Sequence, residues 1–196
     1  GISKKDRGKI LINGLQHEIN NIQDAQTLGF AIIHQELNIC PDLSVLDNIF
    51  LGRRSSINIM GKINVSKMVK MVDEIPNTLS IGMDLQTPIH KLSTIQQWKT
   101  VVNRALITNP RIIILDEPSS YFNFNDLKEL FKCIKQLQDN GTSIIYVTNK
   151  MTETFEVADR VTIIKNGTAV GTTQVHKTNA WNIFQMVDGS ERKKVE

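Results

Sequence analysis

The sequence predicts an α/β fold, with a mainly parallel β-sheet and a helical subdomain. The first observation is that short apolar runs alternate with segments of helical periodicity in the second half of the chain. Such alternation is typical of a parallel sheet with crossover helices. The second observation is a more polar block at about residues 53–92, which predicts a helical insertion outside the sheet. In the second half, strands are expected at 111–115, 143–148 and 160–167, and helices at 126–138 and 151–159.

The N-terminal part of the chain predicts a hairpin, a short helix and a buried strand. Asn13 and Gly14 follow the apolar run 9–12, and an Asn-Gly pair between two such runs is a strong hairpin signal. A short helical stretch at 24–28 ends at Gly29. Residues 30–35, FAIIHQ, then form an expected buried strand that becomes polar only at its last two residues.

Three helices are expected between the two halves. Residues 44–51 predict a helix capped by Ser44, and residues 65–74 predict a second one. The third begins at Ser93, where Ser-x-x-Gln also matches a helix capping box with Gln96. Trp98 lies on its apolar face, and this spacing favours a core position over a ligand contact.

The composition narrows the class of protein. The formal net charge of +3 is too small and too dispersed to argue for a nucleic-acid partner. The two cysteines are isolated and the four histidines are scattered, which indicates a reducing compartment and disfavours a zinc site. No run approaches the roughly 20 apolar residues of a membrane span, and no signal peptide opens the chain. We therefore expect a soluble protein of cytoplasmic type.

Polar side chains follow three of the expected strands. Gln35 follows the strand at 30–33, Asp116 and Glu117 follow 112–115, and Asn149 follows 143–148. In a parallel sheet, ligands bind beyond the carboxyl ends of the strands. The first of two adjacent acids can hold Mg²⁺, and the second can act as a general base on an attacking water. The pattern predicts a hydrolytic site at this edge.

These segments resemble the ATP-binding cassettes of ABC ATPases. IIILDEPSS (112–120) is similar to the Walker B segment, in which LDEP is diagnostic, and HQELNICPDLSVLDNIFLGR (34–53) is similar to the Q-loop region. The stretch 89–118 occupies the place of the signature helix, and 144–172 that of the switch-histidine strand. The resemblance covers nearly the whole chain and is strongest to the first cassette of the two-cassette sugar-importer ATPases. It implies a P-loop NTPase-like fold.

The resemblance implies roles for the residues at the strand ends. Asp116 would be the carboxylate that holds Mg²⁺, and Glu117 the catalytic base. Gln35 would contact Mg²⁺ and the attacking water. The implied cofactors are therefore ATP and Mg²⁺. The implied partners are a membrane permease subunit and a second ATP-binding cassette, with a peripheral location on the cytoplasmic face of the cell membrane.

Three further residues correspond to the other parts of the site. Ser93 and Gln96 would belong to the signature loop, which reaches the γ-phosphate of a nucleotide held mainly by the opposing cassette. Asn149 stands where the family has its switch histidine. Asparagine can donate a hydrogen bond to a γ-phosphate, but it carries no positive charge and shuttles no proton.

The resemblance also divides the chain. Residues 1–52 would be the N-terminal part of the ATPase core with the Q-loop, and 53–108 the helical signature subdomain. Residues 109–188 would be the C-terminal core with Walker B and the switch strand, and 189–196 a polar tail.

The sequence departs from the family at its phosphate cradle. A P-loop needs G-x-x-x-x-G-K-[ST], and neither Gly8-Lys9 nor Gly61-Lys62 satisfies it. The family would place this unit just upstream of Gly1, so the chain is expected to lack it. Within the signature loop, a β-branched Ile95 replaces a small residue where backbone approaches phosphate. The chain alone is therefore expected to be inactive in ATP hydrolysis.

Three functional hypotheses follow. The chain is part of the motor subunit of an ATP-driven sugar importer, or it is a non-catalytic cassette that docks on a membrane subunit or a competent partner. In the third, it is an incomplete fragment whose sheet exposes strand edges and an apolar helix-docking surface.

Overall fold

A computed structural model describes residues 1–53, 63–74, 79 and 84–188. The chain forms two compact units, Gly1–Val147 and Thr148–Glu196, and each is described by itself. The predicted division into segments 1–52, 53–108 and 109–188 stays a prediction. The predicted tail 189–196 lies outside the described residues, as do Pro76 and Gly82 of the expected insertion.

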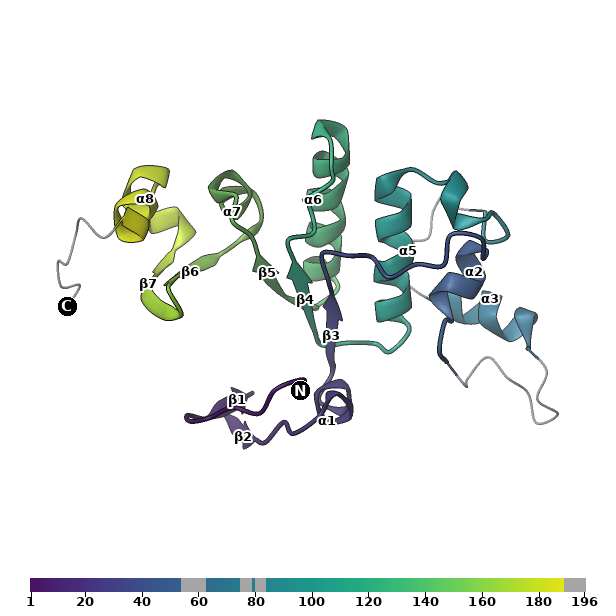
Figure 1. The fold of residues 1–196 in the computed structure, drawn as a ribbon, viewed down its shortest axis with the longest axis horizontal. Coiled ribbons are helices and arrows are strands. Elements are labelled where there is room, and N and C mark those ends of the chain that lie inside the picture. Colours follow the sequence, from purple (N-terminus) through teal and green to yellow (C-terminus); the bar gives the residue numbers. More distant parts are fainter. Residues whose placement is uncertain (54–62, 75–78, 80–83, 189–196) are drawn as a thin grey trace. The chain divides into compact units, whose positions relative to one another are not determined.

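A three-stranded parallel sheet forms the centre of the first unit (Figure 1). Its strands are β3 (Phe30–Ile33), β4 (Ile112–Asp116) and β5 (Ser143–Val147), in the order β3-β4-β5. Ile33 pairs with Leu115, and Asp116 pairs with Val147. The carboxyl ends of all three strands therefore meet at one edge, which confirms the predicted parallel sheet.

Two long helices cover one face of this sheet. Helix α5 (Thr94–Leu106) packs on β3, α6 (Phe124–Asp139) packs on β5, and the two helices contact each other. Because strand side chains alternate between faces, Ile33, Ile113 and Leu115 point toward the helices and are at most 1% exposed. Trp98 is fully buried and meets Phe122 edge to face, which confirms its predicted core position.

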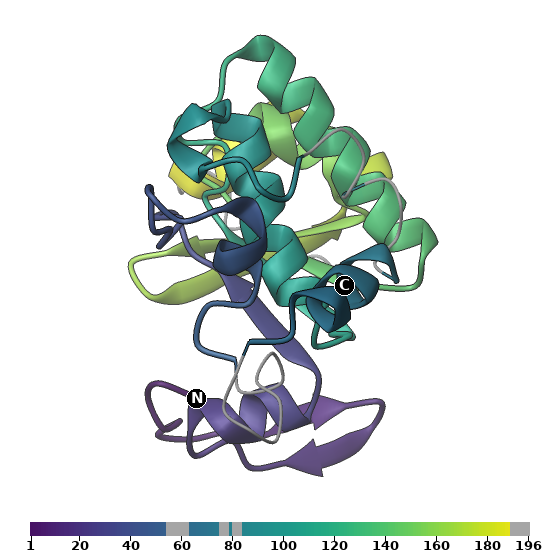
Figure 2. The same ribbon diagram turned by 90° about the vertical axis from the view of Figure 1, so that its right-hand side faces the viewer.

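A hairpin and a short helix precede β3. Strands β1 (Ile10–Ile12) and β2 (Leu15–His17) are antiparallel and turn at Asn13-Gly14, both with positive φ, as the Asn-Gly signal predicts. Helix α1 (Ile22–Thr27) leads to Gly29, which also has positive φ. The carbonyl of Gly29 accepts hydrogen bonds from the Arg111 and Ile112 amides. This anchors the start of β3 beside β4 (Figure 2).

The helical part of the first unit has a core of its own. Helix α2 (Val45–Ile49) begins after Ser44, whose side chain accepts from the Asp47 amide as the predicted cap requires. Helix α3 (Val65–Asp73) and the 3₁₀ turn η2 (Ile89–Lys91) complete the described part. The buried members of this cluster are Val45, Leu46, Ile49, Phe50, Met68 and Val72.

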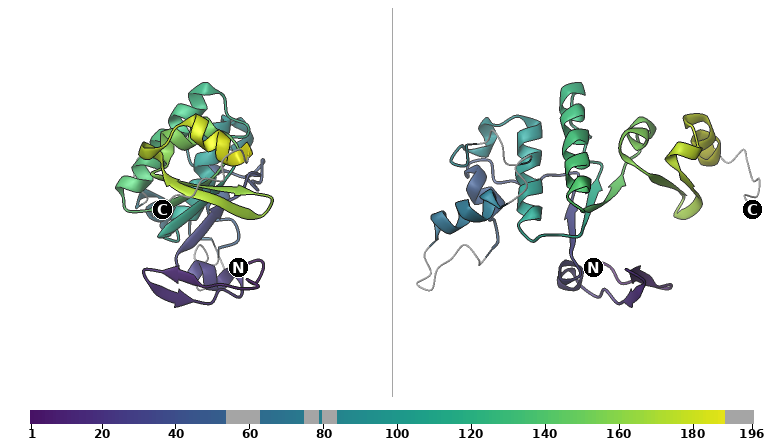
Figure 3. Two further views of the ribbon diagram at one scale, coloured as in Figure 1. Left: turned by 90° about the vertical axis from the view of Figure 1, so that its left-hand side faces the viewer. Right: turned by 180° about the vertical axis from the view of Figure 1, so that it is seen from behind.

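The second unit is a hairpin with helices. It contains α7 (Met151–Val157), β6 (Arg160–Lys165), β7 (Thr168–Gln174), the 3₁₀ turn η3 (Val175–Lys177) and α8 (Ala180–Asp188). Strands β6 and β7 are antiparallel, and α8 packs across both of them (Figure 3). The patterns above predict α7 and β6 but neither β7 nor α8.

Candidate functional site

The two adjacent acids lie where β4 ends. Asp116 is the last residue of the strand, and Glu117 follows with φ +44°, a left-handed conformation. The Glu117 amide donates to the Val147 carbonyl at 2.9 Å. For a residue with a Cβ this conformation costs about 1 kcal/mol, and such strain is concentrated at functional positions.

A turn after the acids brings Ser120 back to Glu117. The Ser120 amide donates to the Glu117 carbonyl at 3.2 Å, and the Ser120 hydroxyl donates to the same carbonyl at 2.9 Å. The hydroxyl also lies 3.5 Å from Oε2 of Glu117. Ser120 therefore fixes the turn that orients the second acid.

Gln35 joins this group from the neighbouring strand. It follows β3 by two residues, and its Nε2 donates to the Ser120 hydroxyl at 3.4 Å. The structure thus brings Gln35 and Glu117 together through Ser120, as the order of β3 and β4 predicts for strand ends. Sequence reasoning placed Ser120 in the segment that follows Walker B, but it did not predict the contacts of Ser120 with Gln35 and Glu117. The available signal was a hydroxyl three residues after an acid, a spacing suited to a side-chain-to-backbone turn.

Ser93 and Gln96 form a separate group at the start of α5. The Gln96 side-chain oxygen accepts from the Ser93 amide at 3.0 Å and from the Ser93 hydroxyl at 3.1 Å. The predicted capping box is therefore present. Their predicted contact with a nucleotide stays a prediction.

Asn149 belongs to the second unit, where it precedes α7. The Thr148 hydroxyl accepts from the Lys150 amide at 3.0 Å and donates to Oε2 of Glu153 at 2.9 Å. Glu153 is buried and also forms an ion pair with Lys150. These contacts organise the first turn of α7 and leave Asn149 exposed just before it.

The side chains at the ends of β3 and β4 offer oxygen atoms as metal ligands. The carboxylate oxygens of Asp116 and the amide oxygen of Gln35 suit a hard cation such as Mg²⁺. Across the described part of the chain, no three His, Cys, Asp or Glu residues are grouped to hold a metal by themselves. Mg²⁺ often binds through one or two carboxylates plus substrate phosphates. The residues therefore fit Mg²⁺ that arrives with a nucleotide.

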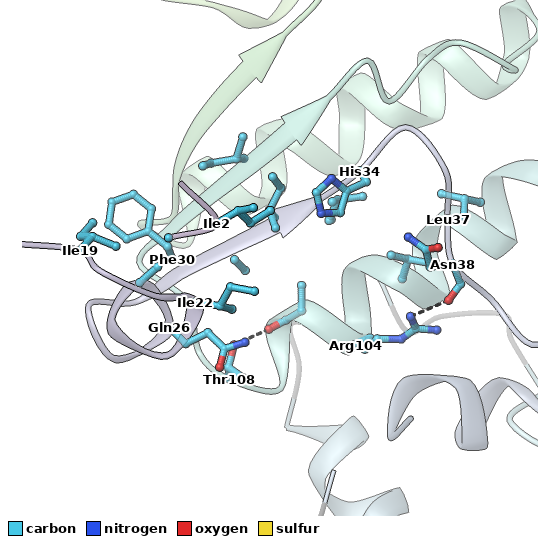
Figure 4. Close-up of a pocket in the computed structure, with 18 of the residues that line it drawn as sticks. Ile2, Ile19, Ile22, Gln26, Phe30, His34, Leu37, Asn38, Arg104 and Thr108 are labelled. Atoms are coloured by element: carbon cyan, nitrogen blue, oxygen red, sulfur yellow. Dashed lines mark hydrogen bonds between the residues drawn. The ribbon is translucent and has the colours of Figure 1, made fainter. Parts of the chain in front are cut away.

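A cavity of about 590 Å³ lies elsewhere in the first unit, among α1, β3 and α5 (Figure 4). Its wall is mainly apolar, with Ile22 and Phe30 among the side chains that line it. Arg104 and Asn38 form a polar edge and are hydrogen-bonded to each other. Neither Asp116 nor Glu117 lines this cavity, so it is distinct from the acids.

Comparison with known proteins decides the family. The sequence model of a family described as "ABC transporter" matches residues 1–120, more than half of the chain. The chain belongs to the ABC transporter family. The resemblance to ABC ATPases that was seen in the Walker B and Q-loop segments is thereby confirmed.

Curated relatives of this ABC chain include ribose import ATP-binding proteins named RbsA. It is 36% identical to that of Bacillus subtilis (strain 168) over 97% of its own length. It is 35% identical to that of Chromobacterium violaceum, again over 97%. The chain spans 38% of the length of each of these relatives.

Solved structures of ABC cassettes share the fold. An ATP-binding cassette of an ABC transporter in its ADP conformation aligns with a TM-score of 0.77 at 18% identity, over 96% of this chain and 76% of that one. A nucleotide-free cassette aligns with a TM-score of 0.76 at 18% identity, over 94% and 76%. The predicted P-loop NTPase-like α/β class is confirmed. Within the described residues, no helix combines the length and apolar character needed to cross a membrane.

Proposed function

We propose that this chain is part of the ATP-binding subunit of an ABC-type sugar importer, in which ATP binding and hydrolysis drive solute uptake. The observation that carries the proposal is the meeting of Gln35 and Glu117 at Ser120, beside Asp116, in a chain of this family. The names of the relatives, which describe ribose import, support the choice of a sugar.

Each residue of the group has a task in this proposal. Asp116 holds Mg²⁺ with help from Gln35, and Glu117 takes the proton of the attacking water. Mg²⁺, when bound, supplies neutralisation of the charge that develops on the phosphates. The Ser120 hydroxyl, which contacts both side chains, holds Glu117 and Gln35 in fixed positions relative to each other.

The remaining proposed contacts lie between proteins. Ser93 and Gln96 reach the γ-phosphate of a nucleotide held mainly by a second ATP-binding cassette. As a separate contact, Asn149 donates a hydrogen bond to a γ-phosphate as a neutral group. A membrane permease subunit is the other proposed partner, which places the protein peripherally on the cytoplasmic face of the membrane. No role with nucleic acid is proposed.

A second candidate is a non-catalytic cassette that docks on a competent partner. Ile95 at the start of α5 and Asn149 before α7 favour it, because one adds bulk and the other lacks a titratable group. An Asn149→His change in a chimera with a P-loop separates the two candidates. A large gain in ATP turnover by the Asn149→His chimera favours an ATPase whose switch residue has been lost. No gain favours the non-catalytic docking role.

A chimera tests the main proposal. The region of the Bacillus subtilis relative upstream of the matched segment is fused before Gly1, and nucleotide binding is measured by titration calorimetry with ATP and with MgATP. The 196-residue chain alone is expected to bind neither, because its sequence contains no P-loop motif. The chimera is expected to bind both, and Mg²⁺ should tighten the binding.

Two variants of the chimera separate the proposed roles. Asp116→Asn should bind ATP but lose the tightening by Mg²⁺, because the amide is a poorer ligand for a hard cation. Glu117→Gln should keep MgATP binding and lose hydrolysis by about 10²–10⁴-fold, the usual contribution of a general base. A folded chimera in which Mg²⁺ binding does not depend on Asp116 would contradict the assignment.

A further inference from the structure

Arg104, near the end of α5, contacts both ends of residues 38–48, a segment after Gln35 that is called the loop here and that includes most of α2. Its Nη1 donates to the Asn38 carbonyl at 2.9 Å, and its Nε donates to the Asn48 carbonyl at 2.8 Å. Figure 4 shows the guanidinium group directed at Asn38 from the helix. One side chain thus ties two points of the loop, ten residues apart, to α5.

Asn48 fastens the inside of the same loop. Its side chain is fully buried and accepts from the Cys40 amide at 2.8 Å. It also donates to the carbonyls of Cys40 at 3.0 Å, Leu43 at 3.3 Å and Ser44 at 3.0 Å. Because Arg104 holds the Asn48 backbone and Asn48 holds the loop, residues 38–48 are fixed to α5 as one piece.

The position of Arg104 is unfavourable for a residue that only fills space. Its Nη2 is buried and has no hydrogen-bond partner among the described residues. Burial is the main cause that lowers the pKa of Arg104; the nearby Cys40 acts in the opposite direction, and the Arg53 guanidinium adds a smaller lowering. An apolar side chain of similar length would fill this site without an unpaired donor. The two bonds to loop carbonyls are what the arginine provides.

We propose that Arg104 is a positioning residue, which couples the segment that carries Gln35 to the helix that begins at Ser93 and Gln96. This proposal rests on the proposed function, because it concerns residues assigned there to the nucleotide. An α-helix of 13 residues is a stiff rod of about 20 Å. A displacement of the loop at the Arg104 end is therefore transmitted to the signature residues at the other end.

The two cysteines of the chain provide a test without nucleotide. Cys40 lies in the fixed loop, and its amide and carbonyl are bound by Asn48. Cys133 is fully buried in α6, and burial raises the pKa of its thiol to about 11. Cys40 is half-buried, so the rate of its reaction with Ellman's reagent reports how far the closed loop protects it, whereas reaction of the fully buried Cys133 reports opening of the core.

The variants are Arg104→Met, Arg104→Lys and, as a matched control, Arg7→Met, which changes an exposed arginine of the same unit. In Arg104→Met, both charged hydrogen bonds to the loop are lost, so the labelling rate of Cys40 should rise by at least about tenfold, the effect of a single such bond on a local opening equilibrium. Arg104→Lys keeps the positive charge but lacks the planar guanidinium group with its several fixed donors. It should therefore give a smaller rise in the Cys40 rate. The Cys133 rate, and both rates in Arg7→Met, should stay unchanged.

Two outcomes would overturn the proposal: an unchanged Cys40 rate in Arg104→Met, or an equal rise for Cys40 and Cys133, which indicates loss of general stability. If Arg104→Met does not fold, hydrogen exchange on the unmodified chain decides. The Cys40 amide should exchange as slowly as the amides of α5, and fast exchange there would overturn the coupling. None of these measurements involves ATP, so a failure of the proposed function leaves them unaffected.

Discussion

Glu117 lies just past β4 in a left-handed backbone conformation that glycine adopts more easily than any other residue. The surrounding hydrogen bonds hold it there, since its amide donates to Val147 and its carbonyl accepts from Ser120. Retaining a carboxylate at this position therefore costs stability. Such a cost is understandable where the carboxylate serves the chemistry.

Replacing this residue by glycine should stabilise the fold relative to alanine. Glu117→Gly and Glu117→Ala both remove the carboxylate, but only glycine relieves the left-handed strain. We expect the glycine variant to have the higher free energy of unfolding, by about 1 kcal/mol. Urea denaturation of both variants measures this difference. Equal stabilities would show that the turn relaxes to a conformation other than the one described.

The residues that sequence reasoning missed act through backbone groups. Ser120 and Arg104 bind backbone carbonyl oxygens. Because every residue has such an oxygen, the residue type does not identify these partners. The acids and Gln35, by contrast, stand directly after apolar runs, and the parallel pairing of those runs places them at one edge. The position of these side chains at neighbouring strand ends can be predicted from the sequence, and their role stays a prediction. A hydroxyl or guanidinium that supports them through the main chain cannot be predicted in this way.

At the scale of elements, an ion pair links α5 to α6. Lys99 and Glu129 lie 2.6 Å apart, and the hydrogen bond from Lys99 is the main cause that lowers the pKa of Glu129 from its ordinary value of 4.5. Because the pKa is lowered in the folded state, the pair contributes stability above about pH 4.5. That contribution is lost as the pH falls through the lowered value.

Lys99→Met should therefore weaken the pH dependence of stability. At pH 7 the expected loss is at most about 1 kcal/mol, because the Glu129 side chain is 37% exposed and solvent screens the pair. The difference from the unmodified chain should shrink as the pH falls below 4.5 toward the acid limit of folding. Urea denaturation over this range provides the measurement.

Lys135→Met is the matched control for this change. Lys135 and Asp139 form an exposed ion pair within α6, and such pairs contribute little to stability. The control should therefore resemble the unmodified chain at every pH. A difference between Lys99→Met and the unmodified chain that stays constant with pH would indicate lost packing and not a lost ion pair.

The elements that the sequence predicts are those with strong local signals. Helix α2 has its Ser44 cap, α5 its capping box, and the first hairpin its Asn-Gly turn. Strand β7 has few apolar residues and is held by pairing with β6, although Asn166-Gly167 at the turn gave the same hairpin signal. Helix α8 is a nine-residue, largely apolar run, whose period does not distinguish a helix from a strand.

At the scale of the whole first unit, α5 and α6 cover one face of the sheet, and among the described residues part of the opposite face is exposed. The side chains of Ile32, Ile145 and Val147 point away from α5 and α6 and are between 46% and 48% exposed. A monomeric protein rarely leaves neighbouring apolar residues of a sheet in water, because each loses the gain from burial. These three side chains form an exposed apolar patch on this face of the sheet.

The 196-residue chain should therefore self-associate as its concentration rises, and charge on the open face should prevent it. We expect Ile32→Lys with Ile145→Lys to shift sedimentation velocity profiles toward the monomer and to reduce binding of a hydrophobic dye. Neither position is buried, so the thermal melt should change little. The pair Gln16→Lys and Gln23→Lys adds the same charge at exposed positions of β2 and α1, outside the strands of the central sheet. If this control disperses the chain equally well, net charge and not the open face governs association. If only the sheet variant does so, the exposed strands are the surface through which the chain associates.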